Sequence, residues 1–219
     1  MTLAAVANLD VLFSITAGEY GAFSGIGSRE TPSDVCRDMT AISAAACSRG
    51  FTLRSGGAGG ADLACEEQVP EDRKEIFLPW KGFNGSPSRF YPAPVSDASI
   101  AASAARQAPT FDPSRILDFD GAKADPIDVA GRALLIARHF HPAWDRCSQG
   151  AQKLHTRNVP QVLGQTLSSP VRFVLCWTKD GGASGGTGQA IRIANALSIP
   201  VLNLQNRLVR QRILSFLGL

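Results

Sequence analysis

The stretch that most constrains the fold runs from residue 172 to residue 189, RFVLCWTKDGGASGGTGQ. Its first part, residues 173–177, is apolar and rich in β-forming residues, which is typical of a strand buried on both faces of a sheet. A glycine-rich turn follows, and from Thr187 the apolar residues recur at the spacing of one helix face. A strand, a glycine turn and a helix in this order direct free backbone N–H groups toward an anion. This single turn is consistent either with a phosphate site or with an ordinary strand-to-helix connection.

Two further turns of the same kind favour the phosphate site. Residues 22–26 form a short apolar run before GSRETP, and residues 51–53 form another before SGGAGGAD. Three such turns suit an open parallel sheet, in which the loops after the strands meet along one edge and bind ligands there. We therefore predict an α/β fold with a Rossmann-like, doubly wound parallel sheet, helices on both faces, and a phosphate-bearing ligand at this edge.

The chain length of 219 residues and an apolar content of 44% predict a single domain with a substantial core. We assign this domain to residues 21–219, with a surface insertion near residues 95–125 and an N-terminal extension at residues 1–20. Alternating apolar residues in the extension indicate an edge strand or an extended lead-in. Residues 143–162 are predicted to form one helix with a break near Pro160, and residues 209–217 a closing helix.

Composition narrows the class of protein further. The formal net charge of +3 permits a nucleotide or nucleic-acid partner without requiring one. The five cysteines form no CxxC pair, which is typical of reduced core residues in a cytoplasmic protein. We expect no signal peptide, no membrane segment and no resident cofactor. His139 and His141 are not spaced as two ligands on one helix turn, so no metal site is predicted.

The candidate ligand-binding residues come from the three turns and from two other segments. Residues 80–94, rich in glycine, proline and aromatics, either stack on a base or anchor a loop. In KLHTRN, His155 and Asn158 are three positions apart and point together on a helix, with Arg157 beside them. Asp62 either accepts from ribose hydroxyls or satisfies helix-start amides. The predicted binding residues are Gly27, Ser28, Arg29, Glu30, Ser55, Gly56, Gly57, Ala58, Gly59, Asp62, Trp80, Lys81, His155, Arg157, Asn158, Trp177, Thr178, Gly185, Gly186, Thr187 and Gln189.

Taken together, these motifs resemble a known family. GIGSRETP, RSGGAGGAD, LPWKGFN, HPAWDR, KLHTRN and CWTKDGG with SGGTGQAIRIA are similar to phage-encoded, DprA-like members of the SMF/DprA–LOG (SLOG) superfamily. The resemblance spans roughly residues 22–204 and implies a Rossmann-like sheet with a nucleotide bound over the glycine loops. It also implies a homodimer or higher homo-oligomer, for which the apolar helix faces at residues 41–46 and 209–217 are candidate surfaces.

The resemblance allows three functions. LOG-type enzymes remove a base from a nucleotide with the glutamate of a PGGxGTxxE motif, but here Ala190 stands at that position with Gln189 beside it, and neither is a general acid or base. We therefore predict no catalytic residue and a protein that binds a nucleotide-derived immune signal, such as an ADP-ribose derivative or a cyclic nucleotide, as a phage anti-defence sponge. The alternatives are an N-glycosidase that uses Asp62 or Glu30 as its acid, and a DprA-like accessory protein of single-stranded DNA recombination.

Overall fold

The computed structural model describes residues 8–15, 21–91 and 96–219, and their central element is a five-stranded, wholly parallel sheet. The strands are β1 (Ala22–Gly27), β2 (Thr52–Ser55), β3 (Lys74–Ile76), β4 (Phe173–Trp177) and β5 (Val201–Asn203). Their order is β3-β2-β1-β4-β5, so the chain reverses its direction of winding between β1 and β4. This confirms the predicted Rossmann-like fold.

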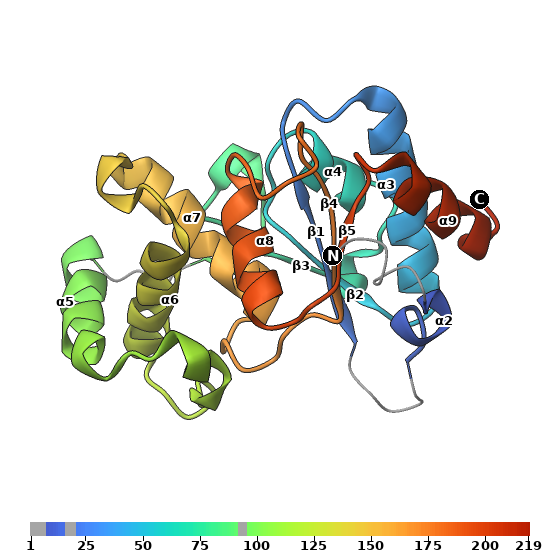
Figure 1. Ribbon diagram of the computed structural model, residues 1–219. Helices are drawn as coiled ribbons and strands as arrows, with labels where there is room; N and C mark the ends of the chain where they lie inside the picture. The colour runs from blue at the N-terminus through green and yellow to red at the C-terminus, as the bar shows by residue number, and fades with distance from the viewer. Residues whose placement is uncertain (1–7, 16–20, 92–95) are drawn as a thin grey trace.

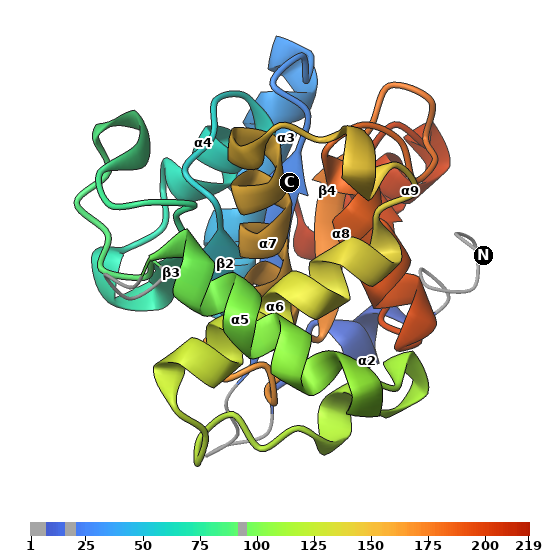
Figure 2. The ribbon, with the colours of Figure 1, turned by 90° about the vertical axis from the view of Figure 1, so that its left-hand side faces the viewer.

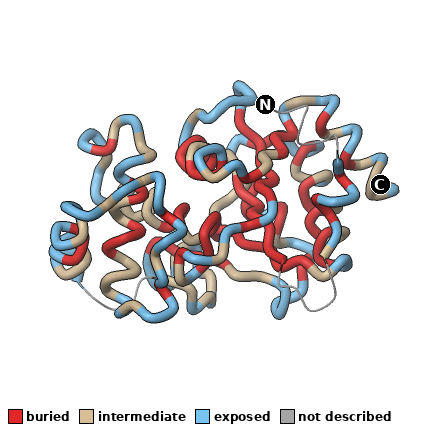
Figure 3. Tube along the Cα trace, turned by 60° about the horizontal axis from the view of Figure 1, so that its bottom comes forward, coloured by how far each residue is buried: buried red, intermediate tan, exposed pale blue. Residues whose placement is uncertain are grey.

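Helices cover both faces of the sheet (Figure 1). One face carries α3 (Ser33–Ser48), α4 (Ala61–Glu66) and α9 (Arg207–Leu217), with the short helix α2 (Leu9–Leu12) beside them. The other carries α6 (Pro126–Phe140), α7 (Gln149–Leu163) and α8 (Thr187–Ala196). Figure 3 shows the buried parts of the chain concentrated in the strands and in the helix sides that meet them.

The two faces of the sheet have separate apolar cores. On the α3 side, four phenylalanines pack ring against ring, and the rings of Phe23 and Phe173 stack with centroids 5.2 Å apart. On the α8 side, strand residues such as Val174 pack against aliphatic residues such as Ile136 and Ile193. Strand β4 is a continuous apolar run because both of its faces are buried.

The predicted insertion forms an outer layer over α6 (Figure 2). Helix α5 (Asp97–Gln107) packs against α6, and the hydroxyl of Ser103 donates to Asp128 Oδ1 over 2.6 Å. Gly131 makes this close packing possible, because a Cβ there would lie 2.5 Å from Ser103 Oγ. The short helix η4 (Pro113–Asp118) then places Ile116 in the core, so the segment is anchored to the domain while most of its residues stay exposed or half-buried.

Two predictions of secondary structure were wrong. Within the described part of the N-terminal extension, residues 9–12 form α2 instead of a strand, because Leu9, Leu12 and Phe13 lie on one helical side and pack into the core; residues 1–7 and 16–20 lie outside the described residues. The helix predicted at residues 143–162 is broken before Gln149, where Ser148 accepts a hydrogen bond from the Ala151 amide and begins α7. Pro160 lies inside α7 without ending it.

The helix faces that were predicted to mediate self-association are partly buried against each other within the protein. Val209 and Ile213 of α9 are buried in the same core as Ile42 and Ala46 of α3. Arg210 of α9 also donates to the carboxylate of Asp34 in α3 over 2.8 Å. Among the described residues, no helix has both the length and the apolar character needed to cross a membrane.

Candidate functional site

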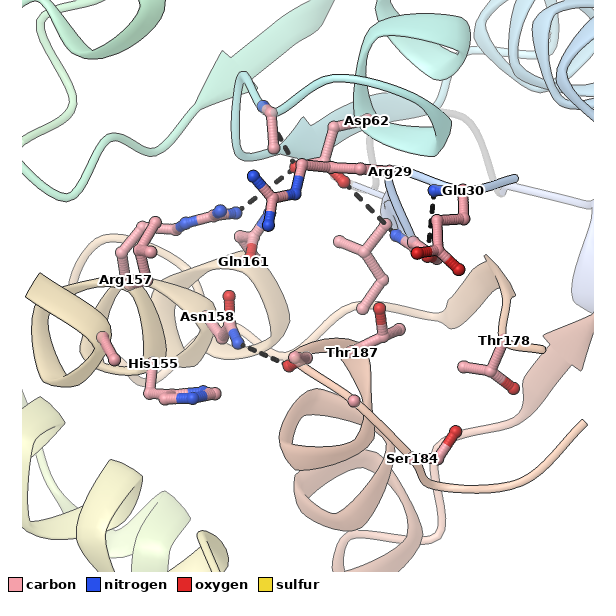
Figure 4. A pocket seen from close by; sticks show the side chains of 18 of the residues that line it. Arg29, Glu30, Asp62, His155, Arg157, Asn158, Gln161, Thr178, Ser184 and Thr187 are labelled. Atoms are coloured by element: carbon pink, nitrogen blue, oxygen red, sulfur yellow. Dashed lines mark hydrogen bonds and ion pairs between the residues drawn. The ribbon is translucent and has the colours of Figure 1, made fainter. Parts of the chain in front are cut away.

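A pocket of about 550 Å³ opens at the carboxyl ends of β1 and β4 (Figure 4). These two strands are neighbours at the point where the winding direction reverses, so the loops that follow them run apart and leave a crevice. The volume lies within the range of about 300–1,000 Å³ that is typical of small-molecule sites. The pocket therefore lies at the switch point of the sheet, the edge at which the sequence analysis expects a ligand.

The structure brings thirteen of the predicted binding residues together around this pocket. They come from the loop after β1, the loop after β2, helix α7 and the loop after β4. They are Gly27, Ser28, Arg29, Glu30, Ala58, Asp62, His155, Arg157, Asn158, Thr178, Gly185, Gly186 and Thr187.

The other predicted residues lie outside the lining. Ser55, Gly56, Gly57 and Gly59 belong to the loop behind the pocket, and Lys81 is exposed beyond it. Trp80 packs edge-on against Phe83 with ring centroids 5.1 Å apart, and Trp177 is buried in the core on the α3 side. Gln189 is wholly buried below the helix start.

A buried ion pair closes one wall of the pocket. Arg157 Nη1 of α7 lies 3.4 Å from Asp62 Oδ2 of α4, and both side chains are less than 10% exposed. Asp62 also accepts long hydrogen bonds from the amides of Gly27 and Ala58, at 3.3 and 3.4 Å. Burial raises the pKa of the Asp62 carboxyl, while Arg157 and the two amides oppose this rise. Asp62 therefore ties the end of β1 to the loop after β2. The amides it accepts from are not those of a helix start, and neither of its two predicted roles is tested by these contacts.

The glycines of the loop after β2 are explained by packing within the protein. A Cβ at Gly56 would lie 1.5 Å from Arg157 Nη1, and one at Gly60 would lie 2.5 Å from the carbonyl oxygen of Ser28. Gly60 also has φ +74°, a conformation that side chains with a Cβ rarely adopt. The absence of side chains in this loop therefore leaves room for Arg157 and for the loop after β1.

The loop after β4 leads directly into the pocket. Helix α8 begins at Thr187, and no side chain of the described residues caps its start. The first N–H groups of a helix have no partner within it and carry partial positive charge, so this helix start is suited to an anion. A Cβ at Gly186 would meet no atom of the described protein within 4 Å. The space in front of Gly186 is part of the pocket.

Positively charged side chains surround the opening. Arg29 and Lys179 line the pocket and are exposed, and within the described part of the chain neither forms an ion pair. Figure 4 shows Arg29 and Arg157 extending toward the middle of the pocket from opposite sides. The acidic residues of the lining are Asp62, which is paired with Arg157, and the exposed Glu30. The charge available to a ligand is therefore predominantly positive.

Several lining residues escaped the sequence analysis. Gln161 of α7 lines the pocket with a fully buried side chain, and neither its Oε1 nor its Nε2 has a hydrogen-bond partner among the described residues. Arg157 Nε is also buried without a partner in this part of the chain. Buried polar atoms without partners are costly, and a polar ligand in the pocket is one way to satisfy them. Gln161 lies one helix turn after Arg157, so the spacing of i and i+4 was the signal that would have found it.

The apolar part of the lining was also missed. Ile26, Phe83, Ala151 and Leu154 line the pocket, and Asn84, Lys179 and Ser184 complete the lining. Phe83 belongs to the aromatic segment in which Trp80 and Lys81 had been chosen, and it is Phe83 that reaches the pocket. Leu154 precedes His155 in α7 and gives the pocket an apolar side.

The position of the LOG-type glutamate is remote from the pocket surface. Ala190 is fully buried in the core on the α8 side, and Gln189 accepts from Asn158 Nδ2 over 3.1 Å and donates to the carbonyl of Ala137 over 2.9 Å. Neither residue lines the pocket. Asn158 also donates to the carbonyl of Gly186 over 3.1 Å, so it holds the turn before α8 in place.

Comparison with models of protein families, with curated proteins and with solved structures finds no match to this chain. The SLOG resemblance therefore stays a prediction, and the functional argument depends on the geometry of the pocket.

Proposed function

We propose that the protein binds a phosphate-bearing, nucleotide-derived small molecule in the pocket between β1 and β4. The observation that carries this proposal is the start of α8, which no side chain of the described residues caps. It faces a pocket with two cations, Arg29 and Lys179, that form no ion pair within this part of the chain. Backbone N–H groups and an arginine are the donors that phosphate oxygens prefer. The apolar side of the pocket, with Phe83 and Leu154, offers a surface for a base.

The arrangement supports binding without cleavage. The position that would carry a LOG-type glutamate holds a buried alanine, and its neighbour Gln189 is engaged by Asn158 and Ala137. A protein that holds a nucleotide signal intact acts as a sponge, and the SLOG resemblance suggests a bacterial immune signal as the ligand. The proposal extends to a cytoplasmic protein and to a homo-oligomer, whose interface would need surface beyond the α3 and α9 sides already packed together.

The test is to incubate the purified protein with ADP-ribose, its cyclised derivatives and cyclic nucleotides, and to detect complexes by native mass spectrometry. Bound material is then released by heat and separated by chromatography. Recovery of the intact nucleotide supports the proposal. Failure of every nucleotide in the panel to bind, together with the absence of a co-purified nucleotide from infected host cells, would contradict it.

Arg29→Ala gives the proposal a residue-level test. Loss of a charge-assisted hydrogen bond should weaken binding by about tenfold, or about 1.4 kcal/mol, at low salt. The difference should shrink at high salt because Arg29 is exposed. Arg37→Ala, on the exposed side of α3 and outside the pocket, is the matched control and should leave the affinity unchanged.

A second function, N-glycoside cleavage, is favoured by one observation. Asp62 borders the pocket, and a carboxyl group at a pocket wall is the type of group that can protonate a leaving base. In the same chromatography, release of free base that Asp62→Asn abolishes would establish the enzyme in place of the sponge. Salt-dependent binding of single-stranded DNA would instead support the recombination accessory protein.

A further inference from the structure

A histidine, a cysteine and a second histidine meet at the connection between α6 and α7, beside the ligand pocket. His141 follows the last residue of α6, Cys147 follows the short helix η5 (Trp144–Arg146), and His155 lies in the second turn of α7. One side-chain nitrogen or sulfur from each residue lies within 4.8 Å of those of the others. The sequence analysis missed this group because it searched for paired histidines on one helix and for CxxC pairs.

The distances suit a tetrahedral metal ion. Cys147 Sγ lies 3.7 Å from His141 Nδ1, and the two imidazole rings have centroids 4.1 Å apart. A zinc ion with Zn–N of about 2.0 Å and Zn–S of about 2.3 Å holds its nitrogen and sulfur ligands about 3.5 Å apart. Only small side-chain movements would therefore close the three ligands around one ion.

One histidine nitrogen of this group is not used by the described protein. His155 Nδ1 is buried and has no hydrogen-bond partner among the described residues. In a neutral imidazole one ring nitrogen carries a lone pair, so this nitrogen can coordinate an ion.

The other two residues of the group, His141 and Cys147, make only weak contacts with the backbone. His141 Nδ1 accepts from the Ala143 amide over 3.2 Å, so this nitrogen carries a lone pair that an ion can take in place of that amide. Cys147 Sγ is 3.6 Å from the carbonyl of Ala143, a weak contact for a thiol. Buried Trp144, between the two residues, anchors the turn that presents them.

From this geometry we propose that His141, Cys147 and His155 form a zinc-binding site. Two imidazoles and a thiolate are ligands that select zinc over magnesium or calcium. Binding breaks the S–H bond of Cys147, releases one proton to solvent and forms a Zn–S bond, with no change in oxidation state. Among the described residues, no further His, Cys, Asp or Glu joins the group, so a water molecule takes the fourth position. Because His155 also lines the pocket, the ion would stiffen that wall.

The test uses Co²⁺ as a spectroscopic probe for the zinc site. The full-length protein is stripped with a chelator, kept reduced and titrated with Co²⁺. We expect one equivalent to bind, with the intense visible bands of four-coordinate Co²⁺ and a thiolate-to-cobalt charge-transfer band, and one equivalent of Zn²⁺ to displace it. Native mass spectrometry should show the same stoichiometry for zinc.

Matched variants decide whether these three residues are the ligands. Cys147→Ser and His141→Gln should remove the charge-transfer band or weaken zinc binding by at least about 100-fold, more than the loss of an outer partner costs. Cys36→Ser, at the other half-buried cysteine, and His139→Ala, at the neighbouring histidine, should leave both unchanged. Circular dichroism checks that each variant is folded. Absence of the bands in the wild-type protein, or their persistence in both ligand variants, would overturn the proposal. Neither result bears on nucleotide binding, which is measured separately.

Discussion

The glycine-rich loop after β2, residues 55–62, and the one after β4, residues 181–188, are similar in sequence but differ in how their glycines are used. At Gly56 and Gly60 a Cβ would overlap other atoms of the protein, at 1.5 Å from Arg157 and 2.5 Å from Ser28. At Gly185 and Gly186 a Cβ would meet nothing within 4 Å in the described structure, and both residues line the pocket. Packing therefore requires glycine at Gly56 and Gly60, although not at Gly59, where a Cβ would meet nothing within 4 Å in the described structure. In the second loop, Gly185 has φ +60°, a backbone conformation that favours glycine, whereas at Gly186 neither a described neighbour nor an unusual φ requires glycine.

Glycines that internal packing requires and glycines that face the pocket therefore look alike in the sequence. In the loop after β2, absent side chains allow Arg157 to reach Asp62 and allow the β1 loop to approach. In the loop after β4, close internal packing occurs at Gly188, where a Cβ would lie 2.3 Å from the carbonyl oxygen of Ala183, and this glycine is behind the pocket surface. Substitutions at the two loops should consequently affect different measured quantities.

The largest effect is expected for Gly60→Ala. The new Cβ would lie 2.5 Å from the Ser28 carbonyl oxygen and 2.7 Å from Arg29 Cα, and both are backbone atoms that cannot turn away. Together with the positive φ, this should lower the free energy of unfolding by about 3 kcal/mol in chemical denaturation. Gly59→Ala, where a Cβ meets nothing within 4 Å, is the matched control and should change stability by less than about 0.5 kcal/mol. Equal losses in the two variants would mean that the loop after β2 is not fixed by packing.

Gly186→Val should have its effect on affinity instead of stability. Gly186 has φ −63° and ψ −33°, which valine can adopt, and the added side chain would occupy the space in front of α8. We expect binding of the nucleotide to weaken by at least tenfold, or about 1.4 kcal/mol, with an unfolding midpoint close to that of the wild type. Calorimetric titration and a thermal melt on the same sample measure both quantities.

Gly150→Val provides the control for this second variant, because Gly150 is also surrounded by open space but lies outside the pocket lining. It should leave the affinity unchanged. If Gly186→Val binds as tightly as the wild type, the phosphate does not lie at the start of α8, and the contrast between the two loops loses its functional meaning.

The smallest effect concerns Asp62, which joins the loop after β2 to Gly27 of the β1 loop. Its pKa is raised in the folded protein by burial, so between the unfolded value of about 3.9 and the raised folded value the folded chain holds more protons than the unfolded chain. The stabilisation that Asp62 contributes is therefore complete at pH values below the unfolded pKa, and it decreases as the pH rises toward the folded pKa. The difference in slope between wild type and Asp62→Asn should be at most about 1.4 kcal/mol per pH unit.

Asp34 offers a control of opposite sign. Its pKa is lowered by the hydrogen bond from Arg210, so its contribution is present above the unfolded value and is lost as the pH falls through the lowered folded value. Denaturation curves at a series of pH values should therefore show opposite changes of slope for Asp62→Asn and Asp34→Asn. If the slope of stability against pH changed in the same direction in both variants, burial would not raise the pKa of Asp62.

The sequence by itself determined the sheet and the edge at which its loops gather. Runs such as residues 173–177 are apolar on both faces, and parallel strands buried in this way leave few alternatives for the fold. The loops that follow parallel strands must gather at one edge, so Gly27, Asp62 and Gly186 were placed near one another before any coordinates were known. Local composition and strand polarity were sufficient for these inferences because both are encoded over short stretches.

Only the tertiary structure decided which residues of each loop face the pocket and which meet at distant contacts. The spacing of residues along SGGAGGAD does not show that Gly56 is a seat for Arg157, which lies about 100 positions later in the chain and returns on α7. In the same way, it is Phe83 and not Trp80 that lines the pocket, and Cys147 lies close to both His141 and His155. These outcomes depend on how whole helices pack against the sheet, and packing joins residues whose separation in sequence carries no periodic signal.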